Sequence, residues 1–194
     1  AILDEDEEEF YVSTKEEALK KALEIIPENH SIGWGGSLSI DGIGLKEELK
    51  KAGHKMIDRD LAKTPEERNQ IMLQALGSDT FLMSSNAITE DGQLFNIDGV
   101  ANRVAALCFG PKSVVIVAGM NKVVPNLDAA YHRVRGFSAP ANAQRFPINT
   151  PCKVTGECGD CTGTDCICNQ FVTTRLCKPA GRIKVILVGE DLGI

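Results

Sequence analysis

A run of four β-branched residues, Val-Val-Ile-Val at positions 114–117, restricts the fold of this chain more than any other feature. The run lies within residues 113–118 and does not alternate with polar residues, which is typical of a central parallel strand covered on both faces. Parallel strands need crossover connections, and these are usually helices. Segments that favour strands and helices alternate along most of the chain. The alternation predicts an α/β three-layer sandwich with a mostly parallel sheet.

Capping residues and glycines mark where the helices begin and end. Thr64 precedes Pro65, and Glu67 stands three residues after Thr64, which is the pattern of a capping box with proline at the first helical position. Ser13 and Glu16 have the same spacing. These signals predict helices at residues 13–26, 45–52, 64–77, 101–109, 126–136 and 139–145, and strands at residues 30–34, 55–58, 79–84, 113–118, 171–176 and 182–188.

Composition is that of one globular domain. Of the 194 residues, 43% are hydrophobic and 25% are charged, which is ordinary for a protein with a packed core. No apolar run reaches the ~18 residues that a transmembrane helix needs, so no membrane span is expected. Nothing resembles a signal peptide, which favours a cytoplasmic location. The chain begins with Ala1 rather than Met, so we expect further residues before it in the natural protein.

Acidic residues are concentrated at the start of the chain. The formal net charge is −6, and residues 4–9 are six consecutive acids. The 21 remaining acids balance the 21 Lys and Arg, so no broad basic face is predicted and nucleic acid is not an expected partner. We expect residues 1–9 to form a solvated acidic stretch and residues 10–194 to form a single folded domain.

A glycine- and serine-rich segment, residues 33–39, lies between a predicted strand and the helix that follows it. In open α/β sheets, ligands bind beyond the carboxyl ends of strands. Glycines there let backbone N–H groups approach an anion, and serine hydroxyls add donors. The alternative is a tight turn whose serines cap a helix. The candidates for ligand contact in this segment are Gly35, Gly36, Ser37 and Ser39.

Polar residues also follow three other predicted strands or turns. Asn86 and Glu90 lie in a segment that ends at Asp91-Gly92, where a turn between two short extended pieces is the competing interpretation. Arg103 stands in an apolar helix and needs an anionic partner, either a ligand carboxylate or phosphate or an internal Asp. Asp98 is equally a helix N-cap candidate. The further candidates for ligand contact are Asp98, Asn102, Arg103, Asn121 and Lys122.

Five of the seven cysteines lie within a loop at residues 149–170 that has few structure-forming residues. Thiolates at such short spacing can hold an iron–sulfur cluster or a zinc ion, and unliganded or redox-active thiols remain an alternative. The cysteines in this group are Cys152, Cys158, Cys161, Cys166 and Cys168. Cys108 and Cys177 are expected to be buried apolar fillers, and the three His are expected to be structural or exposed.

Several of these segments together resemble the LUD domain, the family of lactate utilisation protein C and its relatives. The resemblance covers about residues 10–194 and is carried by motifs that occur in order: Ser-Ile-Gly-Trp-Gly-Gly-Ser at 31–37, Asn-Ala-Ile-Thr-Glu-Asp-Gly at 86–92, Asn-Ile-Asp-Gly at 96–99, Asn-Arg-Val-Ala at 102–105, Phe-Gly-Pro-Lys at 109–112, Asn-Lys-Val-Val-Pro at 121–125 and Leu-Val-Gly-Glu-Asp-Leu-Gly at 187–193.

The resemblance implies a three-layer fold similar to that of ribose-5-phosphate isomerases and CoA transferases. It implies a role in the oxidation of L-lactate to pyruvate, with a small anionic metabolite and iron–sulfur protein subunits as partners. A subgroup of the family has a Cys-rich insertion. Its four positions are similar to Cys152, Cys158, Cys161 and Cys168, which leaves Cys166 as an extra cysteine. No catalytic residue carries over.

Two functions therefore stand as hypotheses from the sequence. The first is an accessory component of L-lactate oxidation in which the Cys loop passes electrons or docks a partner. The alternative is a binding module or enzyme for a small anion (a phosphate, carboxylate or acyl group) with the CoA transferase-like fold. A scaffold subunit with a structural zinc loop is a third possibility.

Overall fold

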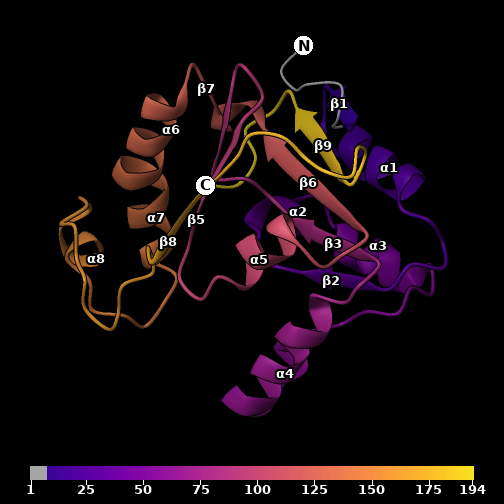
Figure 1. The fold of residues 1–194 in the computed structure, drawn as a ribbon, viewed down its shortest axis with the longest axis horizontal. Coiled ribbons are helices and arrows are strands. Elements are labelled where there is room, and N and C mark those ends of the chain that lie inside the picture. The colour runs from indigo at the N-terminus through magenta and orange to yellow at the C-terminus, as the bar shows by residue number, and fades with distance from the viewer. Residues whose placement is uncertain (1–7) are drawn as a thin grey trace.

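The computed structural model describes residues 8–194, and its centre is a five-stranded sheet in which every neighbouring pair is parallel (Figure 1). The central strand, β6 (Ser113–Gly119), is buried along its whole length, as the β-branched run predicts. The spatial order is β1 (Glu8–Val12), β9 (Ile183–Val188), β6, β3 (Thr80–Met83) and β2 (Ile32–Trp34).

Helices cover both faces of this sheet and confirm the predicted three-layer α/β architecture. On one face, α1 (Lys15–Ile25), α2 (Leu38–Gly42) and α3 (Leu45–Lys51) contribute to a core that includes Ile40, Leu49 and Val117. On the other face, α4 (Pro65–Ala75) and α5 (Asn102–Cys108) contribute to a second core that includes Leu107 and Ile116.

A second, smaller sheet lies against the second core, and the sequence analysis did not separate it from the first. Its order is β7 (Val123–Val124), β4 (Ala87–Thr89), β5 (Leu94–Asp98) and β8 (Gln170–Thr174). The predicted Asp91-Gly92 turn joins β4 to β5, which run antiparallel. The sequence analysis predicted the two short extended pieces around the turn and a strand at residues 171–176, which is β8. Strands as short as β4 and β7 show no hydrophobic period, so their pairing into a second sheet could not be predicted.

One nearly continuous helical stretch covers the small sheet. It consists of α6 (Leu127–Arg133), the π-helical turn η3 (Val134–Ser138) and α7 (Ala139–Ala143). Figure 1 shows this stretch and α8 (Pro151–Thr155) on the side of the molecule opposite α1. Ala130 and Val134 pack against Phe95 and Ile97 of the small sheet in a third core.

Several predicted boundaries differ from the observed ones. Glu8 and Glu9, predicted to be solvated, begin β1 and pair with β9, while residues 1–7 lie outside the described residues. Helix α1 is capped by Thr14 rather than Ser13, because the Thr14 Oγ1 accepts a hydrogen bond from the Glu17 N–H over 3.3 Å. Thr64 caps α4 as predicted.

The strand predicted at residues 55–58 is only an isolated bridge between Ile32 and Met56. The extended segment stops there because the Asp58 side chain caps the 3-10 turn η1 (Arg59–Leu61). Conversely, the short helix α2 was not predicted, and its N-cap is Ser37. In the part of the chain from residue 8 onward, no helix has both the length and the apolar character that a membrane crossing requires.

Candidate functional site

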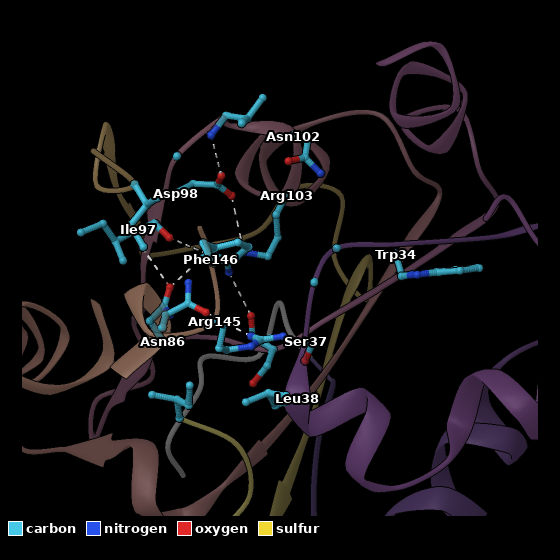
Figure 2. Close-up of a pocket in the computed structure, with 18 of the residues that line it drawn as sticks. Trp34, Ser37, Leu38, Asn86, Ile97, Asp98, Asn102, Arg103, Arg145 and Phe146 are labelled. Atoms are coloured by element: carbon cyan, nitrogen blue, oxygen red, sulfur yellow. Dashed lines mark hydrogen bonds and ion pairs between the residues drawn. The ribbon is translucent and has the colours of Figure 1, made fainter. Parts of the chain in front are cut away.

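A cavity of about 840 Å³ lies where β2 and β3 end, and the turn η2 (Met120–Lys122) that follows β6 reaches the same place (Figure 2). The loop after β5 and the residues around α4 and α7 complete its walls. Carboxyl ends of parallel strands meet at one edge of a sheet, which explains why segments far apart in the sequence converge here. The cavity is therefore the candidate binding site of the molecule.

Two glycines of the β2–α2 loop make room for two arginines. A Cβ on Gly35 would stand 2.9 Å from the Arg103 Cγ, and one on Gly36 would stand 3.2 Å from the Arg59 Nη2. Ser37, at the end of the loop, accepts a hydrogen bond from the Ile40 N–H over 3.3 Å. Ser37 thus caps α2, which was the alternative to ligand contact in the sequence analysis. It also lines the cavity.

The Arg103 guanidinium forms its hydrogen bonds with oxygens of the protein itself. Its Nη1 donates to the Ser84 carbonyl (3.1 Å) and to the Asn96 Oδ1 (2.6 Å). Its Nη2 donates to the Asn86 Oδ1 (3.0 Å) and to the Ile97 carbonyl (2.7 Å). Figure 2 shows these bonds converging on the side chain. The residue therefore holds the loops after β3 and β5 in place.

Asp98 is the internal carboxylate that pairs with Arg103. Its Oδ2 lies 3.5 Å from the Arg103 Nε, which is ion-pair rather than hydrogen-bond distance. Burial lowers the pKa of Arg103, and the Asp98 charge opposes that shift. The other oxygen of Asp98 accepts from the backbone N–H groups of Val100 and Ala101 and so orders the turn that enters α5.

Lys122 is buried beside two serines. It is only 3% exposed, and its Nζ donates to the Oγ atoms of Ser39 and Ser84, each over 3.0 Å. The two hydroxyls are themselves 3.3 Å apart. Burial, followed by the charges of Arg133 and Arg103, lowers the pKa of Lys122 to about 7. Lys122 forms no ion pair with a carboxylate of residues 8–194.

Arg59 is a site residue that the sequence analysis missed. It lines the cavity from η1, and its buried Nε has no hydrogen-bond partner within the described chain. Its Nη1 donates only to the Met72 sulfur over 3.7 Å, and Asp60 stands 4.0 Å from the Nε. Burial is the main cause that lowers the pKa of this guanidinium. In the sequence, Arg59 stands between Asp58 and Asp60, and such a group of charges is typical of a solvent-exposed turn rather than of a binding site.

The structure brings most of the predicted ligand-contact residues to the cavity, but not all. Ser39 lies behind the lining, under the Lys122 ammonium group. Asn121 binds Gly193 and Leu192 through its side chain. Glu90 lies on the exposed side of the β4–β5 turn, where its N–H donates to the Val124 carbonyl. The predicted residues that line the cavity are Gly35, Gly36, Ser37, Asn86, Asp98, Asn102, Arg103 and Lys122.

The Cys-rich loop lies next to α7 and leads into β8, and its Ile167 lines the cavity. Cys152 and Cys166 are buried, Cys158 is exposed, and Cys161 and Cys168 are partly buried. Burial and the neighbouring thiols raise the pKa of Cys168 to about 12, so the five thiols lie within electrostatic reach of one another. Thiolate donors suit zinc and iron–sulfur clusters. Within residues 8–194, however, no three Cys, His, Asp or Glu side chains stand close enough to hold a metal ion.

The two cysteines outside that loop differ from each other. Cys177 is buried, as predicted. Cys108 is exposed, so the prediction that it fills the core is wrong. It is the last residue of α5, whereas Ala106 and Leu107 earlier in that helix belong to the second core.

Comparison with solved structures supports the fold described above. The chain is similar to a DUF162 family protein from Deinococcus radiodurans, with a TM-score of 0.51, 16% sequence identity, and coverage of 94% of this chain and 88% of that one. A weaker similarity to ribose 5-phosphate isomerase A from Neisseria gonorrhoeae has a TM-score of 0.37 and 21% identity, and covers 68% of this chain and 62% of that one. No curated protein matches the sequence.

The family assignment rests on the sequence itself. The LUD domain model matches residues 8–188, which is the stretch from the first strand of the large sheet to its last. The matched segment includes the β2–α2 loop, the Asn86 and Arg103 contacts and the Lys122 turn that form the cavity. The chain therefore belongs to the LUD domain family, which is associated with lactate utilisation.

Proposed function

We propose that the cavity binds a small carboxylate of the 2-hydroxy or 2-oxo acid class, and that the protein acts in the oxidation of L-lactate to pyruvate together with iron–sulfur protein partners. The family assignment supports the connection to lactate utilisation. The charges that line the cavity support the choice of a carboxylate as the ligand.

The observation that carries this proposal is that two basic side chains of the cavity, Arg59 and Lys122, have no carboxylate of the described residues within hydrogen-bond distance. Three cations of the cavity have carboxylate partners: Lys46 with Asp41 (2.6 Å), Arg68 with Asp60 (3.0 Å) and Arg103 with Asp98 (3.5 Å). Because an unpaired buried charge is costly, a bound anion would stabilise this site.

Arg59 is the residue best suited to hold the carboxylate. A guanidinium presents two parallel N–H groups, which match the two oxygens of a carboxylate. The Arg59 side chain is 15% exposed, so a hydrogen bond formed there is less weakened by water than one at the surface. Asn102 lines the same cavity and offers an amide for the 2-hydroxyl or 2-oxo oxygen.

An iron–sulfur cluster, in a partner or in the Cys loop, would accept the electrons that lactate releases. The cysteines to which the resemblance points are Cys152, Cys158, Cys161 and Cys168, with Cys166 as an extra thiol, and they would have to move closer together than in this structure to hold such a cluster. Zinc is the alternative occupant, and it would make the loop structural.

Trp34 provides a direct measurement of binding. It is the only tryptophan of the chain, it lines the cavity, and its buried indole N–H has no partner among residues 8–194. Titration with pyruvate or L-lactate should change Trp34 fluorescence and reach saturation. The Arg59→Gln variant should bind at least about tenfold more weakly, which corresponds to the loss of one charge-assisted contact.

The matched control is Arg175→Gln, which removes the same charge from an exposed position away from the cavity and should leave the affinity unchanged. Inorganic phosphate and ribose 5-phosphate are titrated in parallel. Saturable binding of a phosphate compound without binding of either carboxylate would contradict the proposal and favour the alternative of a phosphate-binding module.

A further inference from the structure

We propose that Lys122 reacts with the ligand: its amine forms a reversible imine with the carbonyl carbon of a 2-oxo acid bound in this cavity. This inference rests on the proposed function, because it requires a 2-oxo acid to enter the site. It assigns a specific chemical role to a residue that would otherwise only add positive charge.

The surroundings of the Lys122 Nζ are those of a reactive amine rather than of a surface ammonium group. Lys122 lines the cavity although only 3% of the residue is exposed. Two of its N–H groups are directed at the Ser39 and Ser84 hydroxyls. The Gly193 backbone packs behind the amine, since a Cβ there would stand 3.1 Å from the Nζ. Ser39, Ser84 and Gly193 thus occupy three sides of the amine, and a ligand would have to approach it from the cavity that Lys122 lines.

The groups that face Lys122 disfavour its protonated form. Arg103 on α5 and Arg133 on α6 bring like charges. Ser39 on α2 and Ser84 after β3 bring neutral hydroxyls, and the segment at Leu192 brings a carbonyl that binds Ser39 rather than the lysine. With burial, these groups lower the pKa of Lys122 to about 7. A large fraction of the amine is therefore neutral, and nucleophilic, near neutral pH.

Lys46, a second lysine that lines the same cavity, differs from Lys122 because it has a carboxylate partner. The Lys46 Nζ lies 2.6 Å from the Asp41 Oδ1 and over the Trp34 ring. This ion pair and the Trp34 ring hold the Lys46 amine in place, so it is not free to approach a bound carbonyl group. Position in the cavity alone does not make a lysine reactive, and Lys46 serves as the internal comparison.

The reaction is balanced without an oxidant or reductant. The Nζ lone pair attacks C2 of the 2-oxo acid, and the carbonyl oxygen takes up a proton, which gives a carbinolamine. The first proton on the oxygen comes from the nitrogen. When the second nitrogen proton follows it, the C2–O bond breaks, water leaves, and the nitrogen lone pair forms the C2=N double bond. The Ser84 hydroxyl, which lines the cavity within hydrogen-bond distance of the Nζ, can relay these protons. Arg59 would hold the carboxylate during both steps.

Reductive trapping tests the proposal directly. The full chain is incubated with pyruvate and sodium cyanoborohydride, and the adduct is located by intact mass and peptide mapping. We expect one adduct, on Lys122, with Lys46 unmodified. Its rate should rise about tenfold from pH 6 to pH 8, as a group with a pKa of about 7 loses its proton. Lys122→Arg should give no adduct, and Ser84→Ala should form it more slowly.

Parallel Trp34 fluorescence titrations separate the possible outcomes. Binding of pyruvate without an adduct on Lys122 would overturn the imine while leaving the proposed function intact. Adducts spread over the exposed lysines at similar rates would also overturn it. An ester on Ser84 after treatment with an acylating reagent, with no imine on Lys122, would identify the lysine as a base for serine instead. Circular dichroism of each variant shows that it is folded.

Discussion

The Arg103 guanidinium donates to the Asn96 side-chain oxygen over 2.6 Å and so links β5 to α5, the helix that follows it. Four further contacts, to the Ser84 and Ile97 carbonyls, the Asn86 amide and the Asp98 carboxylate, fix the same side chain. Arg103 is thus an internal support for the cavity wall, which is the alternative to direct ligand contact that the sequence left open.

Replacing Arg103 should primarily reduce stability. Arg103→Ala leaves the Asp98 carboxylate without its cationic partner and removes the donor from four oxygens, so the free energy of unfolding should fall by about 3 kcal/mol. Urea denaturation measures this loss. Arg103→Lys should recover little of it, because a single ammonium group cannot reach all five acceptors. Weakened pyruvate binding with unchanged stability would instead identify Arg103 as a ligand contact.

Lys122 should make stability depend on pH in an unusual direction. Its pKa is about 7 in the folded protein and about 10.4 in an unfolded chain. Between these values the unfolded state binds more protons, so stability should rise with pH by up to ~1.4 kcal/mol per unit from this group. Lys122→Met should remove that slope. Urea denaturation at pH 7, 8 and 9 measures the free energy of unfolding of both proteins. If this free energy changes with pH by the same amount in both, the lowered pKa of Lys122 in the folded protein would be contradicted.

Asp79 should contribute stability that is lost in acid. It accepts hydrogen bonds from the Ser31 N–H (2.9 Å) and Oγ–H (2.6 Å), and it pairs with Lys112 (2.7 Å). These contacts hold the pKa of Asp79 well below its usual range. Its contribution is therefore complete above the unfolded pKa and declines as the pH falls below about 4.

The Asp79→Asn variant tests this contribution. It should lower the free energy of unfolding at pH 7 by about 1 kcal/mol, and the difference from the natural protein should shrink in acid. Lys112→Met is the control: Lys112 is 76% exposed, so its removal should have a smaller effect. A difference that persists unchanged at low pH would show that the hydrogen bonds do not require the charged carboxylate.

Metal uptake by the Cys loop would require its thiols to move closer together than in this structure, and we expect Cys158 and Cys161 to be essential for it. Protein purified without oxygen is assayed for iron and zinc and by visible absorption. A broad band near about 400 nm with iron would identify a cluster, and colourless protein with zinc would identify a structural site. Replacing both cysteines by Ser should abolish metal retention and leave the fold intact, since both lie outside the three cores. Cys108→Ser is the matched control, and unchanged metal in the double variant would reject the assignment.

The general position of the site could be predicted from sequence because it depends on local patterns. The buried strands around Trp34 and Met83 are apolar runs followed by small polar residues, and parallel strands bring such ends together. Lys122 was recognised as a strand-end cation, but its burial was not. That burial arises from Ser39 and Ser84, which come from distant segments and carry no mark of their contact with a lysine.

Other features depend on tertiary contacts that no local pattern shows. Arg59 is flanked by acids in the sequence, and only the folded structure shows that it lies beside Gly36 with an Nε that has no hydrogen-bond partner among the described residues. Strand β1 begins in an acidic run with low strand propensity, and its pairing with β9 overrides that preference. Thr14 and Ser13 are both capping residues, so spacing alone could not decide which one begins α1.

The order of strands in the large sheet has a consequence for how the chain is assembled during synthesis. Because β9 lies between β1 and β6, Glu8 finds its partner Lys184 only after all the residues between them have been synthesised. Until β9 has been made, the backbone N–H and C=O groups of β6 on that edge have no partner strand and can pair with another polypeptide. Contacts so distant in sequence slow folding, so amide hydrogens of β1 should gain protection from exchange among the last in a refolding experiment.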